Sequence, residues 1–192
     1  MAILVERESL TTKSRHVSPS YVDKDGNQYL TSSDKPFPTL DVNHLRLHEG
    51  RGYYVYKQYP YSAGLGAGAS IDIAIAFPDG IYPHISFSYG ASGETEFYVY
   101  ESPTTSGGTA LTIHRRNRSL ITSSSGAAVL SPTVTSVGTE IFGEFVPADK
   151  QGGGGQLSSF EFVLKPLTSY LLRLTNVNAQ PHAANLLADW YE

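Results

Sequence analysis

The chain has 192 residues, 40% of them hydrophobic, and a chain of this length can bury about 70% of its unfolded surface. It has no cysteine, which excludes disulfides, thiolate metal sites and thiol nucleophiles. The net charge of −4 lacks the excess of Lys and Arg that nonspecific binding to nucleic acid requires. No apolar run approaches the roughly 20 residues of a membrane-spanning helix, and Ala2–Val5 is too short for a secretory signal. We therefore expect a soluble protein, made in the cytoplasm, that binds neither nucleic acid nor membrane and needs no cofactor.

The first fifty residues are polar, hold few aromatic residues, and are predicted to form an extended N-terminal arm. A short hairpin is expected at 23–27, between the segments 21–22 and 28–29, because these five residues are turn formers. The acidic residues of this turn also resemble a calcium loop, but Gln28 stands where such a loop needs glycine, and a plain turn is favoured.

His44 and His48 have the spacing that brings two imidazoles to one metal on a helix, yet Leu45 and Leu47 alternate as in a strand. On a strand the two histidines are about 13 Å apart, too far for one ion. We therefore predict no metal site.

From residue 51 to 192 we predict a β-sandwich domain. Its first strand, residues 53–61, is rich in tyrosine, and alternation puts rings on both of its faces. One face can serve the core, whereas the other is left in water unless a neighbour covers it. The candidates for an interface between copies of the chain are Tyr53, Tyr54, Tyr56 and Tyr59.

Period-two alternation recurs along the rest of the chain, and the segments between the runs are rich in turn formers such as Gly, Pro, Asn and Asp. The alternating segments are 71–77, 85–89, 96–100, 159–164, 170–175 and 183–192. The glycines between 64 and 68 precede a strand and not a helix, so they are interpreted as a flexible connection and not as a phosphate loop. We predict an all-β protein, a jelly-roll-like antiparallel β-sandwich in which helix is minor.

The dense basic run His114–Arg118 follows a strand predicted at Leu111–Ile113. It is either a solvated loop or a docking surface for an acidic neighbour, with Arg115, Arg116 and Arg118 as the candidates, because arginine pairs bidentately with carboxylates.

No catalytic residue is assigned. The chain has no Gly-x-Ser-x-Gly elbow. Glycoside hydrolysis needs only two carboxylates, which leaves this reaction open for the acids on the predicted strands, although solvated strand faces are the simpler interpretation. These acids are Asp72, Glu94, Glu96, Glu140 and Glu144.

Several stretches between residue 48 and the last residue together resemble a group of small virion proteins of tailed bacteriophages. In chain order they are Tyr98-Val99-Tyr100-Glu101, Asn117-Arg118 after the basic run, the glycines 152–155, residues 160–176 and Asp189-Trp190-Tyr191-Glu192. Residues 1–47 fall outside the resemblance.

This resemblance implies a jelly-roll-like sandwich of the capsid decoration, or cement, type. Such a protein coats the outer surface of an assembled head, binds the major capsid protein and carries no catalytic residues. A homo-oligomer is expected, with a trimer favoured over a dimer. The alternatives are a structural protein of the tail or neck and a lectin-like carbohydrate-binding module, because jelly rolls also form lectins.

Overall fold

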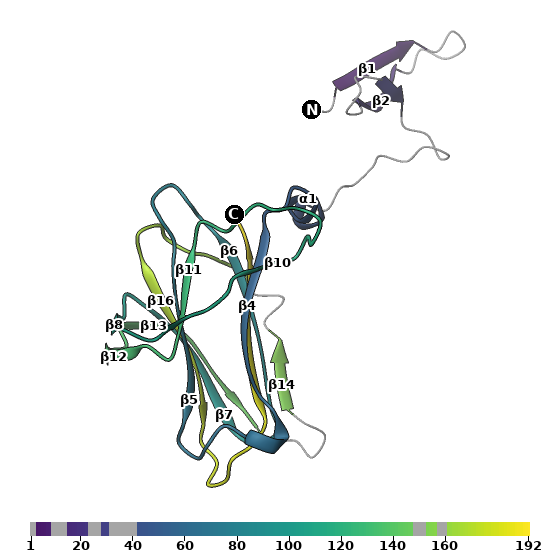
Figure 1. Cartoon of the computed structure of the whole chain (residues 1–192). Coiled ribbons are helices and arrows are strands. Elements are labelled where there is room, and N and C mark those ends of the chain that lie inside the picture. Colours follow the sequence, from purple (N-terminus) through teal and green to yellow (C-terminus); the bar gives the residue numbers. More distant parts are fainter. Residues whose placement is uncertain (1–2, 9–14, 23–27, 31–41, 148–152, 157–160) are drawn as a thin grey trace. The chain divides into compact units, whose positions relative to one another are not determined.

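A computed structural model describes residues 3–8, 15–22, 28–30, 42–147, 153–156 and 161–192 (Figure 1). The chain divides into two compact units, Met1–Val42 and Asn43–Glu192. The sequence analysis placed this boundary eight residues later, after residue 50, because it missed the helix with which the second unit begins.

The described part of the first unit is a three-stranded antiparallel sheet of β1 (Ile3–Glu8), β2 (Arg15–Val22) and β3 (Gln28–Leu30). Val22 pairs with Gln28, as the predicted hairpin requires, while the turn 23–27 and the predicted calcium-like loop lie outside the described residues. The expected arm, residues 1–50, thus contains a small sheet in its first thirty residues and a helix at 42–48.

The second unit consists mainly of strands that pair in antiparallel fashion. Its elements are α1 (Val42–His48), β4 (Gly52–Tyr59), the 3-10 turn η1 (Tyr61–Ala63), β5 (Ser70–Ala76), β6 (His84–Ala91), β7 (Thr95–Glu101), β8 (Thr104–Ser106), β9 (Thr109–Ala110), β10 (His114–Arg115), β11 (Ala127–Leu130), β12 (Thr133–Ser136), β13 (Thr139–Val146), β14 (Gly153–Gln156), β15 (Phe162–Val163), β16 (Ser169–Asn176) and β17 (Ala184–Tyr191).

Two sheets pack face to face (Figure 1). Sheet I has the order β10-β4-β17-β6-β14, with β15 also on β6, and sheet II has the order β13-β7-β16-β5-β11-β9; β8 and β12 form a separate pair. This confirms the predicted all-β antiparallel sandwich. The first four long strands, β4 to β7, alternate between the two sheets, whereas β7, β13 and β16 all belong to sheet II before β17 returns to sheet I.

The core consists of alternate residues from both sheets. Ile71, Ile73 and Ile75 of β5 are buried, and so are Phe87 of β6 and Phe97 of β7, whose ring centroids lie 5.8 Å apart. The alternating pattern therefore located the inward faces correctly. The segment predicted at 159–164 is a strand only at β15, and residues 157–160 lie outside the described part of the chain.

A buried amide ties two connections together at one end of the sandwich. Asn176 is 0% exposed, and its Nδ2 donates to the carbonyl oxygens of Leu65 at 2.9 Å, Gly66 at 3.0 Å and Gln180 at 3.0 Å. Its Oδ1 accepts from the backbone N–H of Asn178 at 2.7 Å. The glycine-rich connection is thus held in place, and its interpretation as flexible was wrong.

The strand predicted around the histidine pair was also wrong, because residues 42–48 form α1. The alternation of Leu45 and Leu47 misled the prediction. Leu47 instead packs over β4, where its Cδ2 lies only 2.4 Å from the place that a Cβ on Gly52 would occupy. Gly52 thereby leaves the space in which this helix sits. No helix in the described residues is long and apolar enough to cross a membrane.

Candidate functional site

Strand β10 forms one edge of sheet I and carries the first half of the basic run. His114 pairs with Tyr54 of β4, and Arg115 pairs with Tyr53. Because successive side chains of a strand point to opposite faces, His114 and Arg115 leave this edge in opposite directions. The strand predicted at Leu111–Ile113 is shifted, since those residues are irregular and the strand begins at His114.

An aromatic cluster lies on the outer face of sheet I beside this edge. The ring of His114 stacks on Tyr54 with centroids 5.2 Å apart and lies 5.9 Å from Tyr56. Tyr54 and Tyr56 stack on each other at 6.2 Å, and Tyr56 is 49% exposed. These two tyrosines therefore remain available for an interface.

The other two candidates for the oligomer interface point inward. Tyr53 is only 4% exposed and lies 6.2 Å from the ring of Trp190, so its assignment to an interface was wrong. Tyr59 is partly buried and packs against the same core. The alternation identified the two faces correctly, but only the packing of the sheets shows which face is covered.

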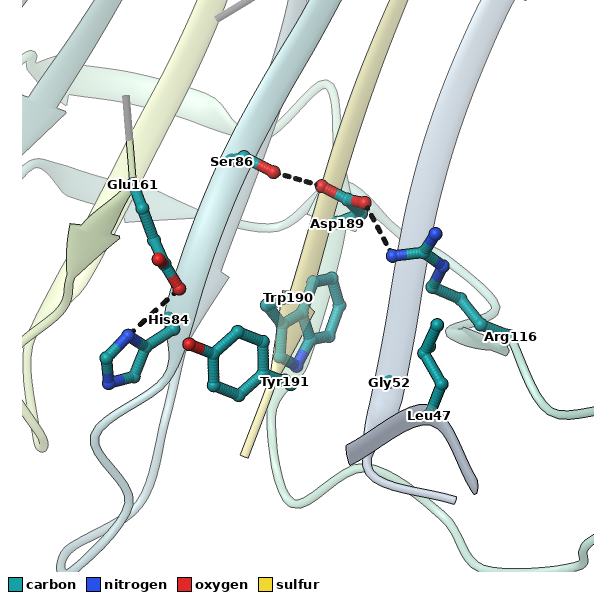
Figure 2. Close-up of a pocket in the computed structure, with 9 residues that line it drawn as sticks. All are labelled: Leu47, Gly52, His84, Ser86, Arg116, Glu161, Asp189, Trp190 and Tyr191. Carbon is teal, nitrogen blue, oxygen red and sulfur yellow. Dashed lines mark hydrogen bonds and ion pairs between the residues drawn. The ribbon is translucent and has the colours of Figure 1, made fainter. Parts of the chain in front are cut away.

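Arg116 belongs to a cleft of about 110 Å³ on the outer face of sheet I (Figure 2). Its Nη1 lies 3.2 Å from Oδ2 of Asp189, whose other oxygen accepts a hydrogen bond from the hydroxyl of Ser86. Leu47 and Gly52 line the same end of the cleft. The charge of Arg116 is thus compensated within the chain.

A histidine hydrogen-bonded to a carboxylate lies at the other end of this cleft. Nδ1 of His84 is 2.9 Å from Oε1 of Glu161, and the His84 ring stacks on Tyr191 with centroids 4.8 Å apart. Figure 2 shows that the Ser86 hydroxyl points to Asp189 and away from His84. A serine nucleophile needs a hydrogen bond to its base, and this arrangement of Ser86 does not provide one.

Arg115 and Arg118 line a different pocket, with a volume of about 320 Å³, next to Tyr53. The Nε of Arg115 is buried and has no acceptor among the described protein atoms. No described carboxylate forms an ion pair with either arginine. The structure therefore splits the three arginine candidates into one that is paired and two that are not.

The segment that lines this pocket is tied to the rest of the domain. Nδ2 of Asn117 donates to the carbonyl of His48 at 3.3 Å, and the Thr122 hydroxyl donates to the carbonyl of Gly50 at 3.2 Å. The Tyr53 hydroxyl donates to the carbonyl of Ser123 at 3.2 Å. These bonds hold the walls of the pocket in place before any ligand arrives.

The two histidines of α1 are close together, because a helix brings positions four apart to one face. Their Nε2 atoms are 3.0 Å apart, which overturns the 13 Å estimate made for a strand. Among the described residues no group of three or more His, Cys, Asp or Glu side chains could hold a metal ion.

Two of the acids considered for glycoside hydrolysis, Asp72 and Glu144, have side-chain partners in the fold. Asp72 forms a bidentate pair with Arg173 at 2.7 Å for both bonds, and Glu144 accepts a hydrogen bond from the Tyr89 hydroxyl. The charge of Glu96 raises the pKa of Tyr98, with a smaller contribution from Glu140. Both acids therefore lie near the half-buried ring of Tyr98 on sheet II.

Comparison of the chain with models of protein families, with characterised proteins and with solved structures gave no match. The function is therefore argued from the residues and the geometry alone.

Proposed function

We propose that this chain is a structural virion protein, a cement protein that docks on the outer surface of a tailed-phage head and stabilises it by bridging capsid subunits. One observation carries the proposal. A stacked pair of tyrosines on β4, the half-buried Tyr54 and the exposed Tyr56, lies next to the edge strand β10. Arg115 of β10 and the nearby Arg118 have no ion-pair partner among the described residues.

Tyrosine and arginine are the residue types that dominate binding energy at protein interfaces. Tyr56 presents a large ring at low entropic cost because a stacked neighbour restricts it. An unpaired arginine on the other side of the same edge offers a fork for a carboxylate of the partner. We call the two sides of this edge together the β10 edge surface: Tyr54, Tyr56 and His114 lie on its outer side, and Arg115 and Arg118 line the pocket on the other side. This surface suits a protein partner better than a small substrate.

The proposed partners are the major capsid protein and other copies of this chain. We assign the tyrosine pair to contact between copies, in a trimer that would fit the threefold and local threefold axes of a head, and the arginines to contact with the capsid. A dimer would fit a twofold seam instead. Linked copies reinforce each weak contact through effective concentration.

The proposal is tested by cosedimentation with expanded heads of the phage that encodes the chain, followed by a density map of the decorated particle. We expect saturable binding at micromolar protein, density on the outer capsid surface and no binding to free DNA at physiological salt. Absence of binding to heads contradicts the cement role, and density at the neck or tail moves the protein to that structure.

The carbohydrate-binding alternative has one observation in its favour. A shallow cavity of about 400 Å³ at the end of β4 is lined by Tyr59, Tyr61, Gln58 and Asn185, and Tyr61 is 83% exposed. Rings beside side-chain amides are the groups that stack on sugars and hydrogen-bond to them. A glycan array probed with the wild type and with Tyr61→Ser tests this alternative. Binding of the wild type to particular glycans, lost in Tyr61→Ser, would establish a lectin role.

A further inference from the structure

We propose that the pocket between Arg115 and Arg118 is a carboxylate-binding site, which takes an Asp or Glu side chain from an acidic segment of a partner protein. The choice of a protein segment as the ligand rests on the proposed docking function. The existence of the anion site rests on the pocket itself.

The basic residues at this end of the domain differ in whether a carboxylate of the chain pairs with them. Arg46 and Arg51 both lie 3.5 Å from Oε2 of Glu49, and Arg116 is paired with Asp189. Arg115 and Arg118 remain without a carboxylate among the described residues, although they line a pocket large enough for a side chain.

The buried Nε of Arg115 is the sharper observation. A buried donor without an acceptor is destabilising, and native proteins rarely keep one without a reason. A carboxylate in the pocket would accept from the guanidinium groups of Arg115 and Arg118 in charge-assisted bonds. The polar groups of the pocket wall do not satisfy this Nε: the Asn117 amide donates to the carbonyl of His48 and accepts from the N–H of Ser119, and the Thr122 hydroxyl donates to the carbonyl of Gly50.

The pattern of charge favours a protein segment over nucleic acid. Nucleic-acid backbones are bound by stripes of about six to ten basic side chains. Among the described arginines of the second unit only Arg115 and Arg118 lack an ion pair, and the carboxylates of Glu49, Asp189 and Glu192 lie in the same region of the domain. One or two carboxylates match this site, whereas a long polyanion would meet the surrounding acids.

The test is titration of the purified full chain with an N-acetylated, C-amidated hexapeptide of alternating Glu and Asp, followed by calorimetry and by the NMR signals of the arginine Nε–H groups. The Gln/Asn hexapeptide, inorganic phosphate and duplex DNA are titrated at the same ionic strength. We expect the acidic peptide alone to bind and to shift the Arg115 Nε–H signal, and we expect added salt to weaken the binding.

The double variant Arg115→Gln/Arg118→Gln should weaken binding of the acidic peptide by about tenfold or more. The matched control Lys57→Gln/Lys165→Gln removes the same charge from outside the pocket and should stay within about twofold of the wild type. Arg118→Gln alone, at an exposed position, should also weaken binding, which keeps the test valid if the double variant folds poorly. Arg115→Lys keeps the charge but loses the planar fork and should bind more weakly than the wild type.

Equal losses in the double variant and the control would overturn the site, as would no peptide binding at millimolar concentration. Phosphate or DNA that binds as well as the peptide and shifts the same signal would overturn the assignment to a protein segment. A double variant that loses the peptide but still decorates heads would leave the anion site standing and exclude it from docking. Failure of the wild type to bind heads, with peptide binding intact, would refute only the cement role.

Discussion

Replacing Asn176 tests whether the buried amide holds one end of the sandwich together. Asn176→Ala removes one acceptor and both amide hydrogens, which between them reach three carbonyl oxygens at 2.9 to 3.0 Å. Each buried group left without a partner costs about 1–3 kcal/mol, although relaxation and water recover part of this. We therefore expect the free energy of unfolding to fall by about 3 kcal/mol, and the melting temperature by about 9 °C for a domain of this size.

The assay is urea denaturation followed by circular dichroism, together with a thermal melt. Asn185→Ala is the matched control, because Asn185 is exposed on β17, and it should change stability by less than about 0.5 kcal/mol. Asn176→Asp should be more damaging than Asn176→Ala at neutral pH, since it places a buried charge against three carbonyls. A loss below about 1 kcal/mol for Asn176→Ala would refute the claim that this amide satisfies the surrounding backbone.

Three further outcomes follow from the structure. Burial raises the pKa of Tyr89 above its ordinary value of 10.0, so the stability that this protonated tyrosine contributes is complete below pH 10 and is lost as the pH rises further. In denaturation experiments at a series of pH values, the wild type should therefore lose stability above pH 10 more steeply than Tyr89→Phe. Tyr54→Ser/Tyr56→Ser should keep the melting temperature within a few degrees but lower the mass seen by light scattering; unfolding instead would place these rings in the core. Gly138→Ala should destabilise the protein by about 2 kcal/mol or more, because the φ of Gly138 is +84° and a Cβ there would lie 2.2 Å from the carbonyl oxygen of Glu101. The control Gly80→Ala has a φ of +77° but open space around it, and it should lose only about 1 kcal/mol. Equal losses in the two variants would mean that the contact with Glu101 does not affect stability.

The sequence by itself determined the class of fold and the inward side of most strands. Ile71, Ile73 and Ile75 are buried where the alternation put them, and Tyr54 and Tyr56 share one face of their strand, as the alternation predicted. Both results follow from a local property of the chain, because side chains two apart lie on the same side of a strand whatever the strand pairs with.

The sequence pattern gave a wrong prediction where the same spacing of apolar residues fits both a strand and a helix. The alternation of Leu45 and Leu47 fits a strand, yet the segment is helical because Leu47 finds its space above Gly52 on β4. The contact between Leu47 and Gly52 joins the helix to a strand of the sheet, and the alternation of two leucines does not reveal it. The helix also brings the imidazoles of His44 and His48 to 3.0 Å, a distance that the strand interpretation had excluded.

The tertiary structure alone decided which carboxylate or pocket each arginine reaches. Arg116 pairs with Asp189, 73 residues further along the chain, and the register of β10 on β4 turns Arg115 to the opposite side, into the second pocket. Neighbouring residues in the sequence carry no information on which distant carboxylate a guanidinium will reach. The partner of a charge depends on which strands become neighbours, and that choice is made by the packing of the whole sandwich.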